Sequence, residues 1–473
     1  MFAPMTAVHV PGRVVWCNFE LARGFGFAVP SWSRMTGELH AQLIAALSYR
    51  LPRPGEELNG PTITLYADQY GGDGIAPYLG SARAGFLPYG DILLKGIGLT
   101  PLFQRHNQDD FPHSHGGCNM NEAIAEAMHG EISRNLFSRE PARILAIIDH
   151  GEDTVYPDGT RLARCILARA GLQLRPAHML ARDARRNGRC RELFLRMAGE
   201  SGQLVQRDGA PDVRATMLRV IDDHASAAAE QVRWRITHGC ISTSNMLTSG
   251  GMLDVVVQCA HPRIADIVPE RKDPERVYFR DYLDRVKQMG KIYRALRKAD
   301  PQLGAIDEYR AMGKAYRHHL DATLLRAAGL KPAAAEALRN VRPELVRRFT
   351  DVLVRMAALR NPGSFRRSRA KVEQHAVVDI LRLLRNLPAP FFADPAGDHR
   401  RRIRAELRPI YRGNPHHIRR KRIVLQRLIA ELAEAYRALM AEACIDGCYD
   451  SAADLQRSVI ARARFENAPL ARL

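Results

Sequence analysis

The sequence changes character once along its length, and this change constrains the fold more than any other feature. The first ~160 residues are rich in glycine and proline and contain short β-type runs separated by loops. After about residue 175, Ala, Leu, Arg and Glu recur with helical spacing. We therefore expect an α+β protein with a small β-rich N-terminal lobe and a larger helical C-terminal lobe. Such pairs of lobes commonly enclose a ligand between them.

The expected elements follow from local patterns of apolar residues. Strands are predicted at 13–16, 62–66, 91–94 and 144–148, and helices at 227–235, 278–296 and 306–325. One helix is expected to interrupt the first lobe near Asn119, with Met120, Ile124, Met128 and Ile132 as its apolar stripe. The predicted division is a β-rich lobe at 1–160, a helical lobe at 161–363 and a basic helical extension at 364–473.

The chain has 473 residues and a formal net charge of +19, with many arginines between Arg366 and Arg422. These arginines indicate either an anionic partner or a solvated helical face. A nucleic-acid partner is not expected, because no zinc finger or aromatic RNA-binding motif accompanies them. The sequence contains no apolar stretch of about 20 residues and no signal peptide, which predicts a cytoplasmic protein with no membrane partner.

The eight cysteines are scattered, which favours a reducing compartment over a disulfide framework. Cys444 and Cys448 lie four residues apart and are interpreted as thiols of a helix rather than as a redox or metal site. A metal site at His113, His115 and Cys118 is weighed against a glycine-rich surface loop, and no metal ligand is assigned there.

Three local features carry the chemistry. The first is Lys95, which ends a β-type run and is suited to holding phosphate oxygens as a point charge. The second is the helix after Asn119, where Glu126, with Glu122 one turn earlier, places a carboxylate within reach of that amine. Helical glutamates and strand-ending lysines are also ordinary solvated residues, so neither feature is decisive alone.

The third feature is the segment from His238 to Asn245, followed by Asp254 in an apolar run. The interval of seven residues between His238 and Asn245 is that of the protein-kinase catalytic loop, in which the Asn holds magnesium. Asn245 and Asp254 offer hard oxygen ligands for Mg²⁺ bridging the phosphates of ATP. The simpler alternative is a polar loop followed by a buried strand. Cys240 occupies the position of the kinase base, which disfavours ordinary phosphorylation of a hydroxyl.

Four segments, in order along the chain, resemble motifs of the selenoprotein O family. Tyr66–Gly72 is similar to the family's YAGHQFG, Leu79–Ala84 to LGDGRA, Asp91–Pro101 to DIQLKGAGxTP, and His238–Met246 with Asp254 to HGxMNTDNM followed by ID. The interval from Asn245 to Asp254 is the same as in the family. Residues 316–330 and 414–429 are similar to its later helices, so the resemblance covers most of the chain.

This resemblance implies a protein-kinase-like two-lobed fold and transfer of AMP from ATP to protein hydroxyls. It implies that Lys95 pairs with Glu126, that Asn245 and Asp254 hold Mg²⁺ or Mn²⁺, and that Gly96 belongs to the nucleotide site. Arg83, Arg169 and Arg175 would then meet phosphate oxygens, although one residue fewer separates the last two here than in the family.

The chain departs from the family at Ser244, where the relatives have the aspartate that resembles a general base. A serine has a poor pKa for that task, so either Ser244 or a histidine takes part in proton transfer or the acceptor is not a hydroxyl. The expected function is an ATP- and Mg²⁺-dependent adenylyltransferase acting on an unidentified protein or small molecule. The alternatives are a ligase that forms an amide through an acyl-adenylate, an inactive pseudokinase scaffold, and kinase-like phosphoryl transfer.

Overall fold

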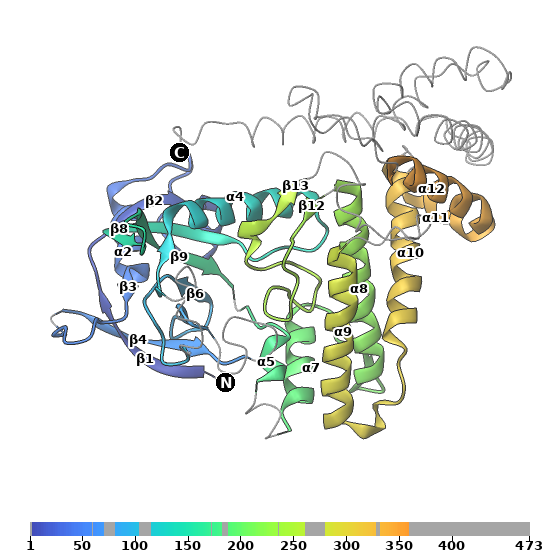
Figure 1. The fold of residues 1–473 in the computed structure, drawn as a ribbon, viewed down its shortest axis with the longest axis horizontal. Coiled ribbons are helices and arrows are strands. Elements are labelled where there is room, and N and C mark those ends of the chain that lie inside the picture. The colour runs from blue at the N-terminus through green and yellow to red at the C-terminus, as the bar shows by residue number, and fades with distance from the viewer. Residues whose placement is uncertain are drawn as a thin grey trace, which may run out of the picture.

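The computed structural model describes residues 2–58, 60–70, 81–103, 115–171, 173–181, 188–234, 236–260, 280–327 and 332–358. Within these residues the protein is a mixed α+β structure, with an antiparallel sheet on one side and a group of long helices on the other (Figure 1). The predictions for His113, for Cys444 and Cys448, and for the basic segment from Ser364 onward lie outside the described residues. No helix of the described part is long and apolar enough to cross a bilayer.

All strands of the main sheet pair antiparallel, in the order β2-β8-β9-β6-β5-β4-β1-β3, with β7 paired to β9. The strands are β1 (Phe2–His9), β2 (Arg13–Cys17), β3 (Tyr49–Arg50), β4 (Thr62–Asp68), β5 (Ala84–Phe86), β6 (Ile92–Lys95), β7 (Cys118–Asn119), β8 (Ile144–Val155) and β9 (Arg161–Ala170). Strand β6 and the second half of β9, from Cys165 to Arg169, are buried on both faces.

Two helices cover opposite faces of this sheet. On one face the buried leucines of α2 (Gly37–Leu47) belong to the same hydrophobic core as Leu94 of β6 and Ile166 of β9. On the other face α4 (Met120–Leu136) packs Ala123 and Ala127 against the intervening residues of β9, such as Leu167. Side chains alternate between the faces of a strand, so the residues of β6 and β9 that do not face α2 face α4.

The helices beyond the sheet form a second body of packed structure, in which α8, α9 and α10 run side by side (Figure 1). Its core consists of residues such as Met217, Met289 and Leu324, which are fully buried. The helices are α5 (Ala177–Leu180), α7 (Cys190–Glu200), α8 (Val213–Trp234), α9 (Arg280–Ala299), α10 (Glu308–Ala327), α11 (Pro332–Val341) and α12 (Pro343–Ala358).

The α+β class is confirmed, as are the expected strands and helices that fall within the described residues, but the sequence predicted too few strands and helices for the N-terminal part. Its sheet also contains β1 and β9, and α1 (Phe19–Gly24) and α2 join α4 among its helices. The simpler alternative for the apolar run that contains Asp254, a buried strand, is wrong. Asp254 has φ 52° and ψ 47°, a left-handed conformation that ends extended structure, and a short 3-10 turn, η1 (Val255–Val257), follows it.

Candidate active site

Lys95 lies at the end of β6 on the face of the sheet that α4 covers. Its side chain is 6% exposed, and its Nζ lies 3.0 Å from Glu126, 2.8 Å from Glu122 and 3.1 Å from Asp254. The pairing of Lys95 with Glu126 is the one that the resemblance implied. Glu122, one helical turn earlier, shares the same amine, because residues four apart on a helix project from the same side.

Two arginines extend this network on either side of Lys95. Arg83, from the segment before β5, donates to both oxygens of Glu122 at 2.6 and 3.0 Å. Arg169 of β9 is 2% exposed, donates from Nε to Glu126 at 2.5 Å and also contacts Asp254. Two-pronged guanidinium-carboxylate contacts fix direction as well as distance. The sheet, the helix and the loop before η1 are therefore joined by buried ion pairs.

Asp254 reaches this network because α4 packs on the turn that follows it. The ring of His129 is bonded to the carbonyl of Val255 at 2.8 Å, and the hydroxyl of Ser133 donates to Gln258 at 2.9 Å. The left-handed backbone of Asp254 is uncommon for a residue with a side chain and is characteristic of functional sites.

The charges of the network shift the pKa values of its members in opposite directions. Burial raises the pKa of Asp254, but Arg169, Lys95 and Arg175 outweigh burial and hold it well below the usual range. Burial would also raise the pKa of Glu122, yet Lys95 and Arg83 lower it to about 2. For Lys95, burial lowers the pKa, and the charges of Glu126, Asp254 and Glu122 raise it above its ordinary value. These groups are therefore charged at neutral pH.

Arg175 connects the network to the loop that contains Ser244. Its Nη1 donates to the carbonyl oxygen of Ser244 at 2.8 Å and lies 4.0 Å from Asp254. Its Nε is buried with no hydrogen-bond partner among the described residues. The Ser244 hydroxyl shares a hydrogen bond of 2.8 Å with Ser242. Ser244 thus contributes a carbonyl that orients Arg175, while its hydroxyl is satisfied locally.

Asp68 and His178 hold Arg175 in place, and the sequence analysis assigned a role to neither. Asp68, at the end of β4, lies 3.5 Å from Arg175 Nη2 and 3.2 Å from His178 Nε2, and both Asp68 and His178 are fully buried. The backbone N–H of Arg175 donates to His178 Nδ1 at 3.0 Å, and the guanidinium lies over the ring of Tyr70. Burial raises the pKa of Asp68, but the charge of Arg175 and the contact with His178 lower it to below its ordinary value.

Asn245 and Asp254 sit on adjacent segments of one turn. The backbone N–H of Leu253 donates to the carbonyl of Asn245 at 3.0 Å. The Asn245 amide nitrogen donates to the carbonyl of Cys240 at 3.0 Å, which leaves the side-chain oxygen as an acceptor. No group of three or more His, Cys, Asp or Glu side chains in the described residues is arranged to hold a metal. Asn245 and Asp254 offer oxygen atoms of the kind that Mg²⁺ takes together with phosphate oxygens, and Asp254 also pairs with Lys95 and Arg169.

A buried carboxylate, which the sequence analysis did not identify, anchors the start of this loop. Asp281 of α9 accepts the backbone N–H of His238 at 2.5 Å and that of Gly239 at 3.1 Å. His238 is itself buried, and its Nε2 is bonded to the carbonyl of Leu253 at 2.6 Å. Burial lowers the pKa of His238. His238 therefore orders the loop, and it is not free to take a proton from a hydroxyl that attacks the nucleotide.

Replacing Asp68 with Asn should destabilise the fold, because the change leaves Arg175 with a weaker buried partner. We expect the free energy of unfolding to fall by about 2–3 kcal/mol, as for other broken buried charge pairs. Denaturant unfolding of the variant would measure this loss.

Asp153→Asn is the matched control, since Asp153 pairs with Arg161 at 3.0 Å on the surface. Its loss should be below about 0.5 kcal/mol. Equal stability of the Asp68 variant and the unmodified protein would contradict the role of Asp68 in holding Arg175.

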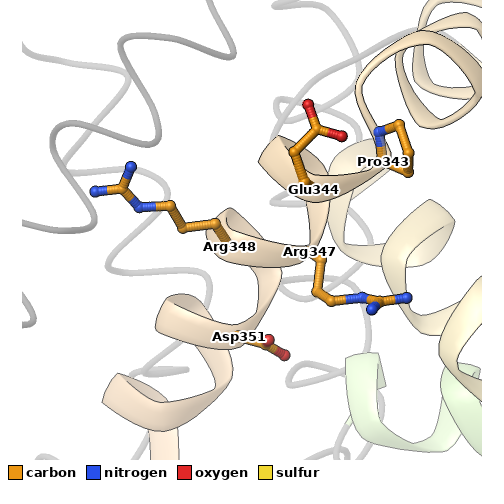
Figure 2. A pocket seen from close by; sticks show the side chains of 5 residues that line it. All are labelled: Pro343, Glu344, Arg347, Arg348 and Asp351. Atoms are coloured by element: carbon orange, nitrogen blue, oxygen red, sulfur yellow. The ribbon is translucent and has the colours of Figure 1, made fainter.

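A separate hollow lies on α12 and is not part of this site. It has a volume of about 460 Å³ and is lined by Pro343, Glu344, Arg347, Arg348 and Asp351. Figure 2 shows Arg347 and Arg348 extending in opposite directions from the helix, so the two guanidinium groups do not converge on one ligand. Helix α12 is remote from the sheet (Figure 1).

Of the nine residues that the sequence nominated, seven are connected by the ion pairs and hydrogen bonds described above, Arg83 by way of Glu122, and Gly96 and Asn245 adjoin them in the chain, next to Lys95 and Ser244. The nine are Arg83, Lys95, Gly96, Glu126, Arg169, Arg175, Ser244, Asn245 and Asp254. Searches against models of known protein families and against curated proteins found no match to the chain.

Proposed function

We propose that the chain is an ATP-dependent adenylyltransferase with a protein-kinase-like arrangement of its sheet and helical parts. The observation that carries this proposal is the meeting of Lys95, Glu126, Arg169 and Asp254 from a strand, a helix, a second strand and a loop. A buried cluster of positive and negative charges adds little to the stability of a fold, because removing the charges from water costs free energy. Such clusters are frequent at sites that bind charged substrates.

The residues would divide the work of binding a triphosphate. Lys95, Arg83 and Arg169 pair with Glu122 or Asp254, and Arg175, whose Nε has no hydrogen-bond partner among the described residues, pairs with Asp68 and lies 4.0 Å from Asp254. In the proposed reaction an acceptor oxygen bonds to the α-phosphorus of ATP, the bond to the β-phosphate oxygen breaks, and pyrophosphate leaves. These cations would stabilise the charge that develops on the leaving group. Mg²⁺ held by Asn245 and Asp254 would supply further charge stabilisation.

The loop around Ser244 favours an acceptor that is already an anion. In the described segment from Ile236 to Asp254, His238 is buried with its Nε2 bonded, and Asp254 is held ionised by its cations. Neither group is suited to removing a proton from a hydroxyl. A carboxylate acceptor needs no such base, and its product would be an acyl-adenylate that an amine can capture as an amide. We therefore place carboxylates ahead of hydroxyls as acceptors.

Phosphorus NMR of the protein with ATP, Mg²⁺ and a lysate of its own cells tests the reaction. We expect pyrophosphate to appear together with an adenylated product. Added hydroxylamine should release AMP from that product as a hydroxamate forms, because acyl-adenylates react with amines and phosphodiesters of hydroxyls do not. ADP as the product would indicate phosphoryl transfer instead, and unchanged ATP would support the pseudokinase scaffold.

A further inference from the structure

Three arginines and one histidine surround the carboxylate of Glu152, near the hairpin end of β8. The nitrogen atoms nearest to its oxygens are Arg53 Nη2 at 2.5 Å, His150 Nδ1 at 3.8 Å, and Arg50 Nε and Arg164 Nη1 at 3.9 Å each. Arg164 and Arg169 are five positions apart on β9, so they project from opposite faces of the sheet. This cluster is therefore distinct from the candidate active site.

Positive charge exceeds negative charge in this cluster. Glu56 accepts hydrogen bonds of 2.7 Å from both terminal nitrogens of Arg50. Among the described residues, Glu152 is then the only carboxylate within ion-pair distance of Arg53 or Arg164. Burial lowers the pKa of Arg164, and although Glu152 raises it, the charges of Arg53 and Arg50 help to hold it below its ordinary value. A further anion would relieve the repulsion between these cations.

Two polar side chains of the cluster also lack hydrogen bonds. Arg164 makes none within the described part of the chain, and its Nε is buried. The side chain of His150 is only 2% exposed, and its Nε2 has no partner among the residues that the structure describes. An unpaired buried polar group costs about 1–3 kcal/mol, and an ion is one of the usual partners that remove this cost. The two side chains thus point to a ligand with acceptor oxygens.

The backbone around Glu152 allows its carboxylate to be replaced. The pairing of β8 with β9 shifts register between Asp149 and Asp153, so Glu152 lies in a bulge outside the regular ladder. Its side chain is 27% exposed. Bulges re-aim side chains and are over-represented beside functional sites. A stronger anion can therefore displace this carboxylate without breaking the pairing of the sheet.

We propose that Arg53, Arg164 and His150 bind an inorganic phosphate ion in place of the Glu152 carboxylate. Guanidinium groups match phosphate oxygens in paired hydrogen bonds, and an imidazole nitrogen that carries a proton is a further donor. Phosphate brings more charge and more acceptor oxygens than the single carboxylate that it replaces. The small exposed fractions of His150 and Arg164, 2% and 19%, favour a free ion over a phosphate carried by a large molecule. The site goes beyond the proposed function, because AMP transfer does not require it.

Substitution Glu152→Gln distinguishes a phosphate site from a merely structural cluster, because it predicts tighter binding. The side chain keeps its shape and loses the charge that competes with phosphate. Calorimetric titration with inorganic phosphate, in EDTA at neutral pH, is the measurement. We expect the variant to bind phosphate at least about tenfold tighter than the unmodified protein, a gain that a damaged fold would not produce.

The gain should disappear when Arg164→Gln is added to Glu152→Gln, since the ion then loses a guanidinium group. The matched control on the same strand is Arg161→Gln, because Arg161 is 66% exposed and pairs with Asp153. Added to Glu152→Gln, it should leave the gain intact. Phosphate held only at the candidate active site would give no gain. No phosphate binding by either protein, no gain in the Glu152 variant, or a gain that survives Arg164→Gln would each overturn the inference.

Discussion

Substituting Lys95 with Met is expected to reduce pyrophosphate release from ATP by about 100- to 1000-fold, the usual loss when one buried donor to a developing charge is removed. Met preserves most of the length and apolar body of the side chain but removes an ammonium that three carboxylates share. The free energy of unfolding should also fall by about 3 kcal/mol, because Glu122 and Glu126 then face each other with less compensation. Coupled measurement of pyrophosphate and denaturant unfolding would report both effects.

The matched control is Lys298→Met, at an exposed position in the last turn of α9. It should change neither the rate nor the stability beyond about 0.5 kcal/mol. If the Lys95 variant folds and releases pyrophosphate at the unmodified rate, Lys95 has no part in the reaction and the candidate site is in the wrong place.

Sequence patterns predicted the position of Lys95 well because the relevant information is local. The run from Ile92 to Leu94 is apolar and buried, and strand alternation decides which face its last residue occupies. The sequence likewise predicted a helix beginning near Asn119, and α4 begins at Met120. Lys95 and Glu126 meet because helix α4 covers the face of the sheet on which Lys95 lies. Periodicity alone did not specify which face the helix would cover.

The face that α4 buries was predicted less well. Ile132 of the expected stripe is buried, but Met120, Ile124 and Met128 are only half-buried, and the other buried residues of the helix are Ala123, Glu126, Ala127, Gly130 and Ser133. The helix buries small residues and Glu126 against the sheet, with Met120 and Ile124 at the edge of the contact, and Glu126 pairs there with Lys95 and Arg169. A periodicity argument counts apolar residues and gives no weight to a buried ion pair, so the tertiary contact overrode it.

The supporting acids and histidine were missed for a different reason. Asp68 lies in a segment used for the family resemblance, but its partner His178 is 110 positions away. Asp281 is similarly distant from the backbone that it binds, at a separation of 43 residues from His238. A polar residue inside an apolar helix or at a strand end is the only local signal for such residues. Such a residue indicates that a buried hydrogen-bond or ion-pair partner is needed, but it does not identify that partner.

Gly96→Ala is expected to be among the most destabilising single changes in the described part of the chain. Gly96 has φ +94°, and a Cβ there would lie 2.5 Å from the carbonyl oxygen of Cys165 and 2.8 Å from the backbone nitrogen of Cys118. Both contacts are with backbone atoms of β9 and β7, which cannot move without disturbing the strands beside Lys95. Backbone strain and overpacking together should lower the free energy of unfolding by about 3 kcal/mol or more.

Gly151→Ala separates the two contributions, because Gly151 has φ +75° and no atom within 4 Å of the added Cβ. That variant should lose only about 1 kcal/mol, the cost of a left-handed backbone for a residue with a side chain. Denaturant unfolding of both variants gives the comparison. Similar losses in the two would mean that β7 and β9 can yield at Gly96. The strand ends around Lys95 would then be less rigid than a preorganised phosphate site requires.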